Sequence, residues 1–126
     1  MFGGASTIVA RKGYSTWVEI DAVLSPLIGA RDMAGLYRRS LMLTLSAHPL
    51  LRVVYEAPPA VSDYTTLRDL LMLQPIPIAV ATDEALLESF KGLLSQLVGP
   101  SVTERVLRLA IDNISSHSAD AKDRSQ

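Results

Sequence analysis

The sequence predicts an all-α protein, an antiparallel helical bundle of four main helices with one or two short ones. Apolar residues recur at steps of three and four within segments separated by glycine and proline, which is the period of amphipathic helices. The chain has 126 residues, 48% of them hydrophobic, and this length fits one domain with one core. We expect a flexible N-terminal arm over residues 1–14, the bundle over residues 15–114 and a disordered C-terminal tail over residues 115–126.

The first helix is expected over residues 15–29. Ser15 is a suitable N-cap and Gly29 a suitable exit. Pro26 lies inside the apolar pattern, so a kink is expected there. The residues that form one apolar stripe on this helix are Trp17, Ile20, Leu24, Leu27 and Ile28.

The second helix is expected from Asp32 to about Ser46, and its apolar residues cover more than half of its circumference. A helix of this kind is central in the fold or carries an interface on its second face. Arg38 and Arg39 mark the wetter side, and Met42 lies beside them, four residues after Arg38. This edge is therefore a candidate interface.

The middle of the chain predicts a short third helix and a fourth helix. Pro49 suits the start of a helix over residues 50–56, and Ser62 is a suitable N-cap for the fourth helix. Two prolines in the segment 74–81 then predict an extended loop. Residues 50–56 and 76–80 are also rich in β-branched side chains, so a small two-stranded element is the alternative.

Two longer helices are expected at the C-terminal end. The fifth begins at Thr82, with Asp83 at its positive end, and stops at Gly99. The sixth begins at Ser101, whose spacing to Glu104 is that of a capping box. The residues expected at the centre of the core are Phe90 and Leu94.

Composition excludes several classes of function. The chain has no cysteine, which excludes disulfides, thiolate zinc sites and iron–sulfur clusters, and we expect no cofactor. A net charge of −1 gives no general attraction to nucleic acid. No apolar run approaches the roughly 20 residues of a membrane span, and the N-terminus lacks the charge order of a secretory signal. We therefore expect a cytoplasmic protein that neither binds nucleic acid nor inserts into membranes.

The protein is not expected to be an enzyme, because no catalytic motif is present. The sequence has no Gly-x-Ser-x-Gly elbow, no Walker loop and no His-Glu-x-x-His pattern. His48 is the candidate phospho-acceptor, since it is the only histidine outside the tail and Arg52 follows four residues later. The proline directly after His48 favours a ring that caps or packs at a helix boundary instead.

The surplus of apolar residues indicates a binding surface. The mean hydropathy is +0.24, and a small domain buries only a limited fraction of its surface. An interface is the simplest place for the remainder, which predicts a protein partner and a homodimer. The predicted partner-binding residues are Arg38, Arg39, Met42 and Leu45. We expect a non-catalytic signalling or regulatory adaptor.

Two stretches of the chain resemble a group of small proteobacterial helical proteins without an assigned function. They are residues 36–44 (LYRRSLMLT), preceded by residues 28–31 (IGAR), and residues 97–108 (LVGPSVTERVLR). In its overall plan the chain also resembles histidine-phosphotransfer domains, which carry a His-x-Leu-Lys-Gly-type motif in mid-helix. Here the lysine and glycine positions after His48 hold leucine and arginine. The resemblance implies an adaptor without phosphotransfer; phosphotransfer by His48 and a structural subunit of a larger assembly are the alternatives.

Overall fold

Six α-helices and one short 3-10 helix account for the described part of the chain, which is residues 3–57 and 63–124 of a computed structural model. These ranges hold no strand, so the predicted all-α class is confirmed and the two-stranded alternative is wrong. In chain order the elements are α1 Gly3–Ile28, α2 Ala30–Thr44, the 3-10 helix Pro49–Leu51, α3 Arg52–Glu56, α4 Thr65–Met72, α5 Ile76–Val98 and α6 Pro100–Arg124.

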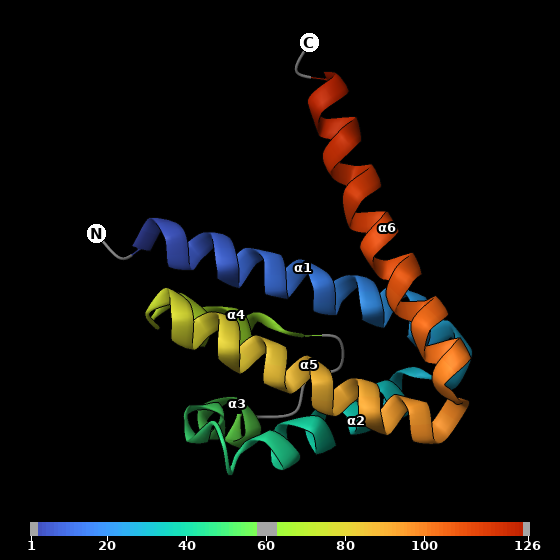
Figure 1. The fold of residues 1–126 in the computed structure, drawn as a ribbon, viewed down its shortest axis with the longest axis horizontal. Helices are drawn as coiled ribbons and strands as arrows, with labels where there is room; N and C mark the ends of the chain where they lie inside the picture. Colours follow the sequence, from blue (N-terminus) through green and yellow to red (C-terminus); the bar gives the residue numbers. More distant parts are fainter. Residues whose placement is uncertain (1–2, 58–62, 125–126) are drawn as a thin grey trace.

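Helices α1 to α5 form the body of the molecule, and α6 rises steeply out of it (Figure 1). Helix α1 packs against α4 and α6, and α2 packs against α5. At the N-terminal end of α1, the hydroxyl of Ser6 donates a 2.7 Å hydrogen bond to the carbonyl oxygen of Gln74, in the turn between α4 and α5. Because α6 leaves the body at a steep angle, the finer expectation of four antiparallel main helices stays a prediction.

Helix α1 includes residues 3–14, for which the sequence predicts a flexible arm. Ser6, Ala10 and Gly13 are buried at spacings of four and three, so they lie on one face of the helix. These residues are small, and the segment therefore packs closely on its neighbours without showing a broad apolar stripe. Ser15 is consequently in the middle of the helix and is not its cap. The first two residues of the expected arm lie outside the described residues.

Helix α5 begins at Ile76, inside the segment that its prolines predict to be a loop. Pro75 is the N-cap, and Pro77 lies in the first turn. The N–H groups of a first turn have no acceptor within the helix, so proline removes no helical hydrogen bond there. The early start places Thr82 and Asp83 inside the helix rather than at its N-cap, and Thr82 is fully buried.

Two glycines end helices at the predicted positions. Gly29 follows α1 with φ of 95°, and Gly99 follows α5 with φ of 89°, a left-handed region that favours glycine. Because α6 begins at Pro100, Ser101 lies inside its first turn and not at the N-cap that a capping box requires. The N-cap position is Gly99, so the capping-box prediction is wrong by two residues.

Helix α6 extends to Arg124, so helix covers residues 115–124, which the sequence predicts as a disordered tail. Residues 125 and 126 lie outside the described residues.

The predicted third helix is confirmed as the 3-10 helix followed by α3, with Pro49 in the first position of the 3-10 helix. Helix α4 begins at Thr65. The Oδ1 atom of Asp63 accepts hydrogen bonds from the backbone N–H and the hydroxyl of Thr65, at 3.0 and 2.6 Å. This Asp side chain orders the start of α4, and Ser62, the predicted cap, lies outside the described residues.

The core is centred on Trp17, the only tryptophan of the chain, which is fully buried. Its ring meets the rings of Tyr37 and Phe90 edge to face, at centroid distances of 5.2 and 5.1 Å. Phe90 and Leu94 are fully buried, which confirms their predicted place at the centre. The fully buried aliphatic side chains around them include Ile20, Leu24, Leu51, Leu67, Leu71 and Leu86.

Candidate functional site

One candidate surface lies on α2 and α3, where the sequence places the partner-binding residues. Arg38, Arg39 and Met42 are exposed. Leu45 is half-buried and packs against the core, so it lies at the edge of any surface that Met42 contributes to. The α2–α3 surface is defined here by Arg39, Met42 and Leu43 of α2 and Val53 of α3.

Arg38 connects α2 to α3. Its Nη1 donates a 3.2 Å hydrogen bond to the carbonyl oxygen of Tyr55, and its Cζ lies 4.4 Å from the centroid of the Tyr55 ring. A guanidinium over an aromatic ring gains cation–π attraction as well. Arg38 is therefore occupied in holding α3 against α2, whereas Arg39 makes no hydrogen bond or ion pair with the residues that the structure describes.

Apolar side chains on the α2–α3 surface remain in contact with solvent. The exposed fractions are 48% for Met42, 51% for Leu43 and 61% for Val53. Single exposed apolar residues are common on soluble proteins, but groups of them mark interaction sites. Sequence reasoning does not single out Leu43 or Val53. Apolar residues surround more than half of α2, so the sequence does not show which of them face the core and which face solvent. The sequence of α3 also suits a strand, so the exposed side of Val53 could not be assigned.

Arginine dominates the charge of α2 and α3. The exposed cationic residues are Arg31, Arg38, Arg39 and Arg52, and the exposed carboxylates are Asp32 and Glu56. This local positive excess contrasts with the net charge of −1 of the whole chain. The potential near this surface therefore attracts acidic groups.

His48, the candidate phospho-acceptor, lies at the boundary that the sequence predicts for it. The residue is half-buried and is the N-cap of the 3-10 helix. Its Nδ1 is 3.4 Å from the hydroxyl oxygen of Thr82 on α5. Within the described residues the structure does not bring the guanidinium of Arg52 into a hydrogen bond with this ring. His48 is thus in contact with the core and is not part of the α2–α3 surface.

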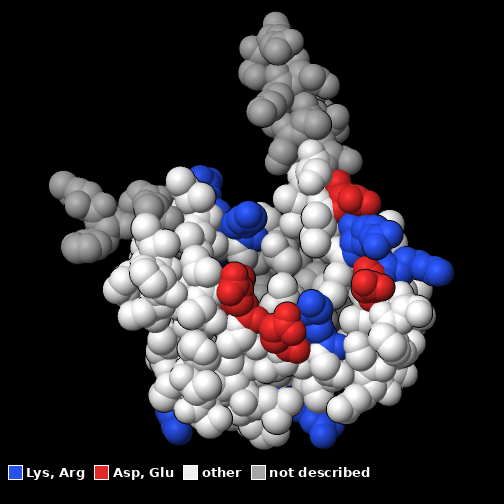
Figure 2. All heavy atoms as spheres, viewed as in Figure 1, with Lys and Arg blue, Asp and Glu red and all other residues white. Residues whose placement is uncertain are grey.

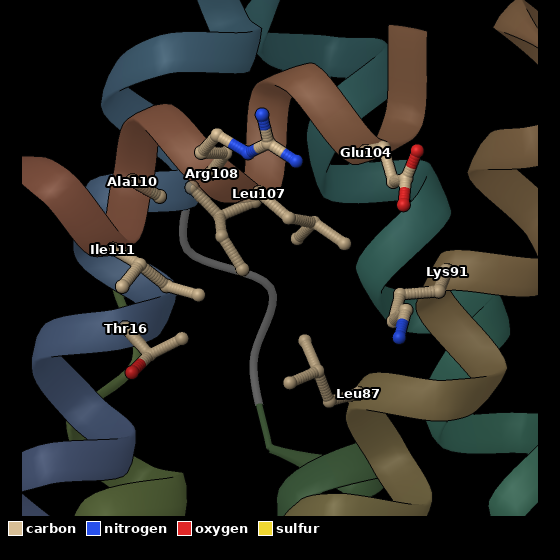
Figure 3. A pocket seen from close by; sticks show the side chains of 9 residues that line it. Thr16, Leu87, Lys91, Glu104, Leu107, Arg108, Ala110 and Ile111 are labelled. Atoms are coloured by element: carbon tan, nitrogen blue, oxygen red, sulfur yellow. The ribbon is translucent and has the colours of Figure 1, made fainter. Parts of the chain in front are cut away.

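The second candidate surface is a groove of about 310 Å³ between α1, α5 and α6. Its apolar walls include Ile20 of α1, Leu87 of α5, and Leu107 and Ile111 of α6. Figure 3 shows Leu87, Leu107 and Ile111 pointing toward one space from two helices. The sequence does not predict this groove, because only the packing of three helices brings its walls together.

Charged residues of both signs surround the groove. Lys91, Glu104 and Arg108 line it, and the Nζ of Lys91 also lies 3.4 Å from a carboxylate oxygen of Glu88. Figure 2 shows a hollow on this face with basic and acidic side chains around it. Glu104, which the sequence predicts as part of a helix cap, is therefore a residue of the groove edge.

Two carboxylates inside the body bind core side chains. Asp21 accepts hydrogen bonds from the hydroxyls of Tyr64, at 2.5 Å, and Ser25, at 2.7 Å. Asp83 accepts a 3.2 Å hydrogen bond from the Nε1 of Trp17. Burial raises the pKa of Asp83, and burial together with the bond to Asp21 raises the pKa of Tyr64. These contacts join α1 to α4 and α5 and so fix two of the helices that form the groove.

Among the side chains that the structure describes, no group of three His, Asp or Glu residues is placed to hold a metal ion. In residues 3–57 and 63–124 no helix has both the length and the apolar character needed to cross a bilayer. Comparison of the chain with protein-family models, curated proteins and solved structures found no match.

Proposed function

We propose that this protein is a non-catalytic signalling or regulatory adaptor of the cytoplasm, and that it binds a protein partner through the α2–α3 surface. The observation that carries the proposal is the pair of exposed apolar side chains Met42 and Leu43 beside Arg39 on α2, whose guanidinium is free in the described part of the chain, together with the exposed Val53 on the adjoining α3. A partner that covers them removes apolar area from water, which is the main favourable term in association.

The charge of the surface indicates what kind of partner fits. The exposed arginines of α2 and α3 outnumber the exposed carboxylates. Guanidinium groups bind carboxylates in a planar, two-point manner, and complementary charge accelerates encounter and selects the partner. We therefore expect an acidic segment with an apolar face, in which carboxylates meet Arg39 and apolar side chains cover Met42 and Leu43.

Arg38 supports this surface without being available to the partner. Because its guanidinium lies against Tyr55, it keeps α3, which carries the exposed Val53, in place beside α2. Replacing Arg38 is expected to disturb the surface through the position of α3, and replacing Arg39 through direct contact.

Site-directed photo-crosslinking in the native cell tests the proposal. A photoreactive amino acid at position 42 is expected to capture one predominant protein, and the same group at Leu27, an exposed apolar residue at the end of α1, is the control position. The captured protein is then purified, and its binding to the parent chain is measured by titration calorimetry. Arg39→Glu is expected to weaken binding by a factor of about 10 or more, as for a charge pair at an interface, and the loss grows smaller at high salt.

Two variants distinguish the loss of a contact with the partner from a loss of folding. Arg39→Glu and Met42→Ser change exposed side chains, so both are expected to unfold at the temperature of the parent. Equal affinity of the captured protein for parent, Arg39→Glu and Met42→Ser would show that the partner binds elsewhere. A captured protein that never dissociates from the chain in the cell would instead identify a structural subunit of a larger assembly.

A further inference from the structure

We propose that the groove face is an interface between two copies of this chain, in which the α6 helices of the two copies pack against each other around a two-fold axis. This proposal uses a different surface from the α2–α3 surface and assigns it a different occupant. Two properties of the groove face carry it: the apolar residues on one side of α6 and the pattern of charge.

The apolar side of α6 that faces the groove is incompletely covered. Leu107 and Ile111 are four residues apart, so they lie on the same side of the helix, and both line the groove. Ile111 is 58% exposed and Leu107 is half-buried. Among the side chains that the structure describes, Ile20 and Leu87 form walls of the groove, but none covers Ile111 from above it. A second helix laid along α6 would cover it.

The charges at the groove favour a second copy as the occupant. Glu104 and Arg108 are one turn apart on α6, about 6 Å along the axis, and both line the groove. In a two-fold interface the same patch occurs on both partners. If residue i of one copy contacts residue j of the other, residue j of the first copy also contacts residue i of the second. An axis that passes between Glu104 and Arg108 places the carboxylate of each copy against the guanidinium of the other. A patch with both signs is self-complementary in this way, whereas the arginine-rich α2–α3 surface repels its own copy.

Sedimentation equilibrium of the purified full chain tests the proposal. Interfaces of standard size associate at micromolar concentration or below, so at about 100 μM we expect twice the 13.7 kDa mass of one chain. Ile111→Glu is expected to raise the dissociation constant of the dimer by a factor of about 10 or more, because a charged side chain replaces the apolar one that the partner would bury. The matched control is Leu109→Glu. Leu109 is 49% exposed and lies two residues away, on the opposite side of α6, so this variant is expected to dimerise as the parent does.

Charge reversal tests the two-fold arrangement itself. Glu104→Arg and Arg108→Glu each place like charges opposite each other in the dimer, and each is expected to weaken dimerisation by a factor of about 10 or more. The double variant Glu104→Arg/Arg108→Glu restores opposite charges across the axis, so it is expected to recover most of the loss. Circular dichroism and thermal unfolding of each variant verify that α6 remains folded.

Several outcomes overturn the proposal. If the parent chain sediments as a monomer up to about 100 μM, the groove is not a standard-size interface between two copies, because such interfaces associate at lower concentrations. Equal weakening by Ile111→Glu and Leu109→Glu places the contact elsewhere on α6, and a double charge variant as weak as the single ones excludes the two-fold pairing of Glu104 with Arg108. None of these variants changes the α2–α3 surface, so failure of the dimer proposal does not bear on the adaptor proposal, which the crosslinking experiment tests separately.

Discussion

Asp83 shows how one side chain can conflict with its surroundings. Its carboxylate accepts a hydrogen bond from Trp17, and an added Cβ on Gly13 would lie only 3.1 Å from it, so α1 and α5 close over it. Burial raises the pKa of Asp83 above the ordinary 3.8. Burying the ionised form of this carboxyl therefore costs stability, although its position and its hydrogen bond help to align the two helices.

Asp83→Asn is expected to increase the free energy of unfolding at pH 7. The carboxyl is ionised in both states well above its raised folded pKa, so the full penalty of burying the charge is present there; below pH 3.8 it is protonated in both states and the penalty is absent. Asn keeps an oxygen that accepts from Trp17 and carries no charge at any of these pH values. The advantage of the variant should therefore fall as pH is lowered from 7 to below 3.8.

Urea unfolding of parent and Asp83→Asn at a series of pH values measures this difference, and the gain at pH 7 reports the shift at about 1.4 kcal/mol per pKa unit. A variant that is less stable than the parent at pH 7, by the same amount at every pH, would contradict the sign of the shift.

At the scale of elements, glycine and proline decide where the helices begin and end. Two prolines permit the start of α5 because they occupy its N-cap and first turn, and two glycines with positive φ end α1 and α5. A glycine inside a helix lowers the stability of the protein. It adds backbone freedom to the unfolded chain, and the helical conformation does not require it. Gly92 lies inside α5, and apart from its own helix backbone and chain neighbours no atom lies within 4 Å of an added Cβ.

Gly92→Ala and Gly99→Ala are expected to have opposite effects on stability. The first replaces an unneeded helical glycine and should raise the free energy of unfolding by about 1 kcal/mol. The second forces an L side chain into the left-handed region at φ of 89° and should lower it by roughly 1–2 kcal/mol. Thermal unfolding of both variants and the parent checks the pair. Destabilisation by Gly92→Ala would contradict the open space that this fold leaves around Gly92.

At the scale of the whole molecule, one aromatic core holds helices from both halves of the chain. Trp17 of α1 contacts Tyr37 of α2 and Phe90 of α5, and it stacks on Tyr64 at a centroid distance of 6.1 Å. Because these contacts are distributed over the body, loss of one central ring should weaken the entire fold rather than one helix.

Phe90→Ala is expected to lower the free energy of unfolding by about 3–5 kcal/mol, a large part of the stability of a domain of this size. Leu97→Ala is the control, because Leu97 lies further along the same helix and is 57% exposed, and its effect should stay within about 0.5 kcal/mol. Urea unfolding followed by Trp17 fluorescence and by circular dichroism should show one coincident transition for each variant. Near-equal stability of Phe90→Ala and the parent would contradict this position of the core.

Local features of the sequence determined the helical class, the glycine stops and the central position of Phe90, because helix periodicity and capping depend on residues only a few positions apart. The sequence also indicated surplus apolar residues and the exposed edge at Arg39 and Met42. Packing between distant helices decided the rest. It buried the small residues Ser6, Ala10 and Gly13 of α1, turned Leu45 inward and Val53 outward, and built the groove from α1, α5 and α6. The face that a helix buries depends on which other helices meet it, and that information is not contained in any one segment of the chain.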